Sequence, residues 1–154
     1  MLHVHGAYNY TVQILDAKTT TDLPNNPPPA GTTAVALLVR VEAEPRNRSI
    51  MAPTIELGIN YPSLTTDLDK HPGTGLGTYL DDGTDYLTED QLLSGGEGTE
   101  GVRPMTGALQ ANTVYYHWVW QLVSEKANLT DASLCETRSI GHNCIPIGAI
   151  KRKA

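Results

Sequence analysis

The chain has 154 residues, a formal charge of −6 and a hydrophobic content of 40%, which is the composition of a single globular domain spanning residues 1–154. Because an acidic surface repels phosphate backbones, this charge argues against nucleic-acid binding. No apolar run approaches the roughly 20 residues that cross a bilayer as a helix, so we expect no transmembrane segment.

The first part of the chain predicts two strands separated by a proline-rich loop. We expect the start of the chain to be disordered, although an extended start would place His3 and His5 on one face. Tyr8–Leu15 alternates apolar and polar residues, as a half-buried strand does. Residues 19–33 hold four prolines, which remove donors from a sheet ladder and predict a surface loop or a polyproline arm.

The second predicted strand is Ala34–Glu44, whose alternation is the clearest in the chain. Its expected core face consists of five apolar residues: Val35, Leu37, Val39, Val41 and Ala43. The opposite face becomes polar toward the end of the strand, at Arg40 and Glu42. Pro45 and the polar residues after it predict a turn.

The middle of the chain predicts one more strand and then a long loop region. Thr54–Asn60 alternates through Ile55, Leu57 and Ile59. Residues 63–107 are rich in glycine and contain nine of the seventeen acidic residues. A loop region this long in a small domain is usually functional or mobile. We expect at most one short helix in it, at Thr88–Ser94, which starts with a capping-box sequence and is followed by Gly95.

The segment Thr113–Val123 contains four of the nine aromatic residues and predicts a strand with one buried face. The even-numbered face carries both tryptophans, so we expect it to form the centre of the core. The opposite face, with Tyr115, His117 and Val119, is unusually apolar for a wet surface. We therefore expect that face to be covered by the long acidic loop or offered to a partner as an interaction surface. Two short strands, within 132–137 and 145–150, follow.

The two cysteines, Cys135 and Cys144, would close a short loop that contains Gly141 and Asn143. We expect a disulfide, with free buried thiols as the alternative. A zinc site would need two further ligands, and only His142 lies nearby in the sequence. A disulfide would indicate an extracellular or cell-surface location, because reducing compartments keep thiols reduced.

Many short strands, turns between them and almost no helix predict an all-β fold, an antiparallel immunoglobulin-like β-sandwich. The order of features resembles the small secreted or lipid-anchored immunoglobulin-like domains of Gram-positive bacteria. The resemblance lies in the strand Ala34–Glu44, the turn and strand after it, and the glycine-to-strand passage Gly107–Val123. It implies an extracellular β-sandwich and brings no catalytic residues with it. The late cysteine pair and the absence of phenylalanine depart from the family pattern.

Motifs that carry chemistry are sparse. Asp81, Asp82 and Asp85 offer hard oxygen ligands for calcium, but they lack the spacing of an EF-hand loop, and Asp-Gly is also a common turn signal. We therefore expect no metal or cofactor, with these three aspartates as the weak candidates. Sequons occur at Asn9, Asn47 and Asn128, and they matter only in a eukaryotic secreted protein.

The chain lacks the G-x-S-x-G, H-E-x-x-H and phosphate-loop motifs of common enzyme classes. We accordingly expect a protein that is not an enzyme but an extracellular or cell-surface binding domain, with the two long loops as contact surfaces. The alternative is a structural subunit of an extracellular assembly or a virion. A binding domain would have a protein partner, whereas a structural subunit would self-assemble through the N-terminal segment or Ile145–Ile150.

Replacing both Cys135 and Cys144 with serine should lower the free energy of unfolding by about 2–3 kcal/mol, because the unfolded chain gains conformational entropy when the short loop is no longer closed. Urea unfolding with and without a reducing agent measures this. If the reducing agent does not change the midpoint of the wild-type protein, the two thiols are not bonded.

Overall fold

The structure is a computed structural model, which describes residues 1–5, 8–20, 28, 30–51, 57–62, 64, 81–82, 108–109, 111–112, 114–137 and 143–151. Every element in these residues is a β-strand, and all pairings between strands are antiparallel, so the predicted all-β antiparallel class is confirmed. The strands are β1 (Leu2–His5), β2 (Asn9–Thr20), β3 (Thr32–Ala43), β4 (Ile50–Met51), β5 (Leu57–Asn60), β6 (Asp81–Asp82), β7 (Ala108–Leu109), β8 (Tyr115–Ser124), β9 (Ser133–Glu136) and β10 (Cys144–Pro146).

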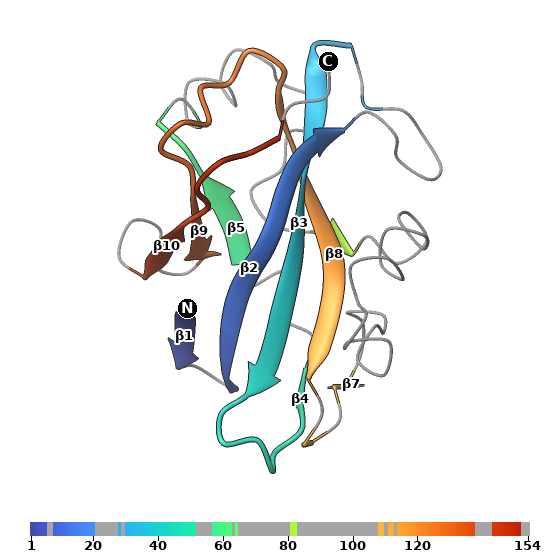
Figure 1. Cartoon of the computed structure of the whole chain (residues 1–154), viewed down its shortest axis with the longest axis vertical. Helices are drawn as coiled ribbons and strands as arrows, with labels where there is room; N and C mark the ends of the chain where they lie inside the picture. Colours follow the sequence, from blue (N-terminus) through green and yellow to red (C-terminus); the bar gives the residue numbers. More distant parts are fainter. Residues whose placement is uncertain are drawn as a thin grey trace.

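The largest sheet has five strands in the order β1-β2-β3-β8-β6, and its long strands curve around one side of the molecule (Figure 1). β3 lies at its centre, between β2 and β8. Residues 34–39 of β3 are apolar without interruption and all are buried, as expected of a strand that is covered on both faces. The predicted core face of β3 is confirmed, because Val35, Leu37, Val39, Val41 and Ala43 all belong to the main hydrophobic core.

β2 is longer than the sequence predicts, because a bulge interrupts its alternation. Before the bulge, Val12 and Ile14 lie opposite Val41 and Val39; after it, Ala17 lies opposite Leu37. The register shifts between Ile14 and Asp16, and Leu15 is 43% exposed. An extra residue reverses which positions face the core, so a strict period of two ends at Leu15 although the strand continues to Thr20. The predicted loop at 19–33 therefore begins and ends inside β2 and β3.

The predicted faces of β8 are wrong. β8 pairs with β3 so that Val35 lies opposite Gln121, Leu37 opposite Val119 and Val41 opposite Tyr115. Directly opposed residues point to the same side of a sheet, so the core face of β3 brings the odd-numbered residues of β8 inward. Tyr115, Val119 and Val123 accordingly lie in the main core, and Gln121 is 1% exposed.

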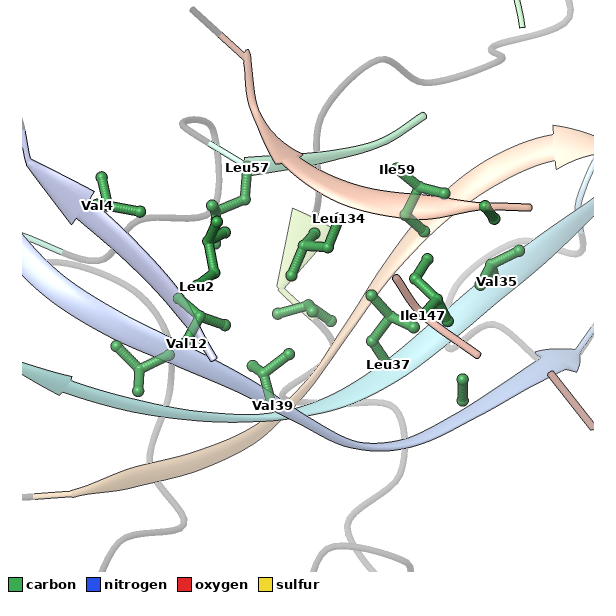
Figure 2. Close-up of a cluster of buried hydrophobic side chains, with 14 of the residues drawn as sticks. Leu2, Val4, Val12, Val35, Leu37, Val39, Leu57, Ile59, Leu134 and Ile147 are labelled. Carbon is green, nitrogen blue, oxygen red and sulfur yellow. The ribbon is translucent and has the colours of Figure 1, made fainter. Parts of the chain in front are cut away.

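The second layer is a three-stranded sheet, β10-β9-β5, that packs on the concave side of the large sheet. Figure 2 shows Leu57, Ile59 and Leu134 from this layer facing Leu37 and Val39 of β3. The same core takes in side chains of β1, so the predicted disordered start is wrong: Leu2 and Val4 are buried, and His3 and His5 share the exposed face. A separate two-stranded pairing joins β4 to β7.

A buried glutamine connects the two layers. The Ile59 N–H donates to Oε1 of Gln121 at 2.8 Å, and Nε2 of Gln121 donates to the Ile59 carbonyl at 3.1 Å. Ile59 sits on β5, which pairs with β9 and has no second strand partner among the described residues. The Gln121 amide therefore satisfies the main-chain groups that point away from β9, as a neighbouring strand would.

The other face of the large sheet carries a second, smaller cluster. Trp118 packs there with Ala36 and Leu38, and Trp120 lies against them. Lys18 crosses this cluster with its ammonium group 4.9 Å from the centre of the Trp118 ring. Trp118 is thus as buried as predicted, 1% exposed, but on the opposite side of the sheet from the main core.

The predicted disulfide between Cys135 and Cys144 is confirmed, with the two residues directly opposite in β9 and β10. Beside it, Nδ2 of Asn143 donates to the His3 carbonyl and to the Glu136 carboxylate, both at 2.8 Å. The hairpin is therefore tied to the outer edge of β1.

Several predicted features lie outside the described residues: the helix at Thr88–Ser94, the side chain of Ile55, and most of the two loops at 19–33 and 63–107. In the part of the chain that is described, no helix is long and apolar enough to cross a membrane.

Replacing Gln121 with leucine should lower the free energy of unfolding by about 2–5 kcal/mol, because it leaves a buried N–H and a buried carbonyl of Ile59 unsatisfied while keeping most of the side-chain volume. Urea unfolding measures the change. The matched control is Gln13→Leu on the exposed face of β2, which should change stability by less than about 0.5 kcal/mol. Equal effects in the two variants would contradict the role of the buried amide.

Replacing Trp118 with alanine should cost about 3–5 kcal/mol, the usual cost of removing a fully buried aromatic side chain. Thermal and urea unfolding check this, and Leu15→Ala at the exposed bulge is the control with little expected change. Unchanged stability of the Trp118 variant would show that this face of the sheet is open to solvent.

Candidate functional site

The best-defined surface feature among the described residues is the turn that joins β3 to β4, at the lower end of the molecule in Figure 1. We call residues Glu44 to Ser49 the β3–β4 turn. Three main-chain hydrogen bonds hold it: Glu44 N–H to Asn9 at 3.0 Å, Arg48 N–H to Pro45 at 3.2 Å, and Asn112 N–H to Arg46 at 2.6 Å. The turn is therefore fixed both to the start of β2 and to the residues that precede β8.

Charged side chains cluster at the base of this turn. The Glu42 carboxylate, 17% exposed, receives Arg40 at 2.9 Å on one oxygen and Arg46 at 2.6 Å on the other. His3 Nδ1 lies 3.2 Å from the Glu44 carboxylate. Charge-assisted hydrogen bonds to a half-buried carboxylate are stronger than surface ion pairs, so Glu42 orients both arginines.

Two adjoining hollows flank the turn, and Glu44 and Pro45 line both of them. The larger, about 410 Å³, we call the Tyr8 hollow; its other lining residues are Tyr8, Asn9, Arg48, Ser49 and Ile50. The smaller, about 260 Å³, lies on the side of β1 and includes His3, Glu42 and Arg46. The lining of the Tyr8 hollow is mostly polar, whereas more of the smaller hollow's lining is apolar.

Two side chains in the Tyr8 hollow are available to a ligand. Tyr8 is 39% exposed, and it is one of three exposed large hydrophobic side chains among the described residues. Arg48 is exposed as well, and its guanidinium has no ion-pair partner among the residues that the structure describes. Arg46 differs from it, because Arg46 is already bonded to Glu42.

Two of the three predicted interaction residues do not lie at the surface. Tyr115 and Val119 are 4% and 1% exposed, inside the main core, so neither side chain can contact a partner. The prediction of an interaction face there is therefore wrong for these two residues, for the reason of register given above. His117 lies opposite Val39 in β8, and its side chain is outside the described part of the structure.

The calcium candidates are only partly described. Asp81 and Asp82 form β6 and pair with Trp120 and Val119 of β8, while Asp85 lies outside the described residues. Within the described ranges, no group of three or more His, Cys, Asp or Glu side chains is arranged to hold a metal ion.

Sequence reasoning treated the β3–β4 turn only as a turn and did not single out Tyr8 or Arg48. A signal was present, since charged residues stand at every second position from Arg40 through Glu42, Glu44 and Arg46 to Arg48. Three of the six arginines fall within these nine residues. In an acidic chain, such a concentration of arginines marks an end of the sheet where positive charges offset the local acidic residues.

Comparisons with protein-family models, with curated proteins and with solved structures found no match to this chain. The site therefore has to be interpreted from its own residues.

Proposed function

We propose that this protein is a non-catalytic binding domain that acts outside the cell, and that the β3–β4 turn is its contact surface. The observation that carries the proposal is an exposed arginine without an ion-pair partner among the described residues, Arg48, held on a turn with three main-chain hydrogen bonds beside the exposed Tyr8. Arginine and tyrosine dominate recognition surfaces, because each offers a large contact area and a directed polar group. A rigid turn keeps the ordering cost of binding low.

The geometry of the turn supports binding more than catalysis. His3 and Glu44 form the nearest pair that resembles an acid–base couple, with side chains 54% and 42% exposed. Catalytic pairs are usually desolvated and oriented by further groups, so that charges act strongly on the reacting atoms. A pair this open to water suits a recognition surface.

The proposed location outside the cell is supported by the disulfide between Cys135 and Cys144, since such bonds persist in oxidising compartments. We also propose that the two packed antiparallel sheets are the layers of an immunoglobulin-like β-sandwich. Support comes from the shared core between the five-stranded and three-stranded sheets. The similarity to the Gram-positive surface domains belongs to this same proposal.

The alternative function, a structural subunit, needs free sheet edges for self-assembly. The outer edge of β1 is engaged within the chain at His3, whose carbonyl accepts a hydrogen bond from Asn143. Farther along, the C-terminal segment occupies the edge of β2, where Lys151 forms a parallel bridge to Lys18. These contacts favour the binding domain, since they use edges that an assembly would need.

A photo-crosslinking residue is placed at position 47, at the tip of the turn, and the protein is mixed with the extracellular fluid or the cells of its natural environment. It should form covalent adducts with the partner. The matched control is the same residue at position 128, another exposed asparagine. Adducts at 47 that are absent at 128 are expected. Equal labelling at both positions, or none at 47, would contradict the proposed contact surface.

With the adduct identified, Arg48→Ala should weaken the affinity of the partner at least tenfold, because a guanidinium contact is lost. Lys126→Ala removes an exposed positive charge from the turn after β8 and should change the affinity less than twofold.

Sedimentation equilibrium of the free protein should give a monomer of 16.6 kDa. A larger assembly would support the structural subunit instead.

A further inference from the structure

The Tyr8 hollow holds a chemically mixed set of groups on one small surface. Arg48 can only donate hydrogen bonds, and Asn9 and Ser49 can both donate and accept them. The Glu44 carboxylate, one oxygen of which lies 3.2 Å from His3 Nδ1, can only accept them. The Tyr8 ring adds an apolar face with a hydroxyl at its edge. A ligand that uses the whole hollow must therefore donate and accept hydrogen bonds and also present an apolar side.

The charges of the hollow favour a neutral ligand. Arg48 would attract an anion, but Glu44 lines the same hollow and would repel it. A cation would meet the reverse arrangement. A neutral ligand with several hydroxyl groups can bond to both residues, since a hydroxyl donates to the carboxylate and accepts from the guanidinium.

The size and openness of the hollow fit a ring-shaped ligand at a surface. Its volume of about 410 Å³ lies in the range of small-molecule sites. The residues that line it are Tyr8 and Asn9 at the start of β2, four residues of the β3–β4 turn, and Ile50 of β4. The Glu44-to-Asn9 hydrogen bond joins the turn to β2. Both walls are thus held in place before a ligand arrives, which reduces the entropy lost on binding.

We propose that the Tyr8 hollow is a carbohydrate-binding site, in which the C–H face of a neutral sugar ring packs on Tyr8 and its hydroxyls bond to Arg48, Asn9 and Glu44. Sugars combine an apolar ring face with hydroxyls that both donate and accept, which matches this lining group by group. The inference rests on the proposed function, because it names the ligand class of the same contact surface.

Titration of the isotope-labelled protein with neutral trisaccharides tests the proposal by NMR; the probes are cellotriose, chitotriose, maltotriose and mannotriose. At least one of them should give saturable shifts centred on the amides of Asn9, Ser49 and Ile50. Trigalacturonate and inorganic phosphate serve as the anionic probes. Binding of only the anionic probes, or shifts centred elsewhere on the molecule, would overturn the carbohydrate site.

Variants separate the ring contact from general effects on the fold. Tyr8→Ala should weaken binding of the active trisaccharide at least tenfold, while Tyr8→Phe, which keeps the ring, should stay within threefold. Leu15→Ala changes an equally exposed apolar side chain outside the hollow and should leave the affinity unchanged. Since Tyr8 is exposed, the spectrum of each variant should remain that of a folded protein. Equal affinity of wild type and Tyr8→Ala would overturn the proposal.

The outcomes distinguish this inference from the proposed function. If crosslinking at position 47 finds a specific partner but none of the four neutral trisaccharides binds, the carbohydrate site is wrong and the binding domain stands. If neither experiment gives a signal at this end of the molecule, both proposals are wrong.

Discussion

The fold depends on one buried polar contact, the pairing of the Gln121 side chain with the main chain of Ile59. Among the described residues β5 is an edge strand, and edge strands carry main-chain donors and acceptors without a strand partner. Inside a core such groups are costly unless they are satisfied. The amide of Gln121 supplies both bonds, and it comes from the opposite sheet. This contact therefore sets the position of β5 relative to β8, while the apolar side chains around it supply most of the area that is buried.

The large sheet also positions the proposed contact surface. β3 runs through the centre of the large sheet and ends at the β3–β4 turn, so the turn is held by a strand that is paired on both sides. The Glu44-to-Asn9 hydrogen bond joins the turn to β2, and Glu42 orients Arg40 and Arg46 at its base. Arg48 is left exposed on this support beside Tyr8. Rigid scaffolds that end in polar turns are a common way to present binding residues.

Much of the strand content could be predicted, because alternation with a period of two is a local property. The core face of β3 and the Cys135–Cys144 bond follow from such local patterns. Two features misled the prediction. The bulge at Leu15 reversed the alternation of β2 within one residue, and β8 is apolar on both faces, so that its aromatic content pointed to the wrong one. The candidate site was missed because Tyr8 and Arg48 are far apart in sequence and look ordinary alone.

The sequence by itself determined the all-β class of the described part of the chain, where most of its long strands lie, and which two cysteines could bond. Only the tertiary structure decided that β8 lies beside β3 and in which register, and therefore that Tyr115, Val119 and Gln121 face inward while Trp118 faces the other side. The physical reason is that a strand's period of two leaves its two faces equivalent until a partner fixes the register. For Thr113–Val123, pairing with β3 fixes which face lies in the main core.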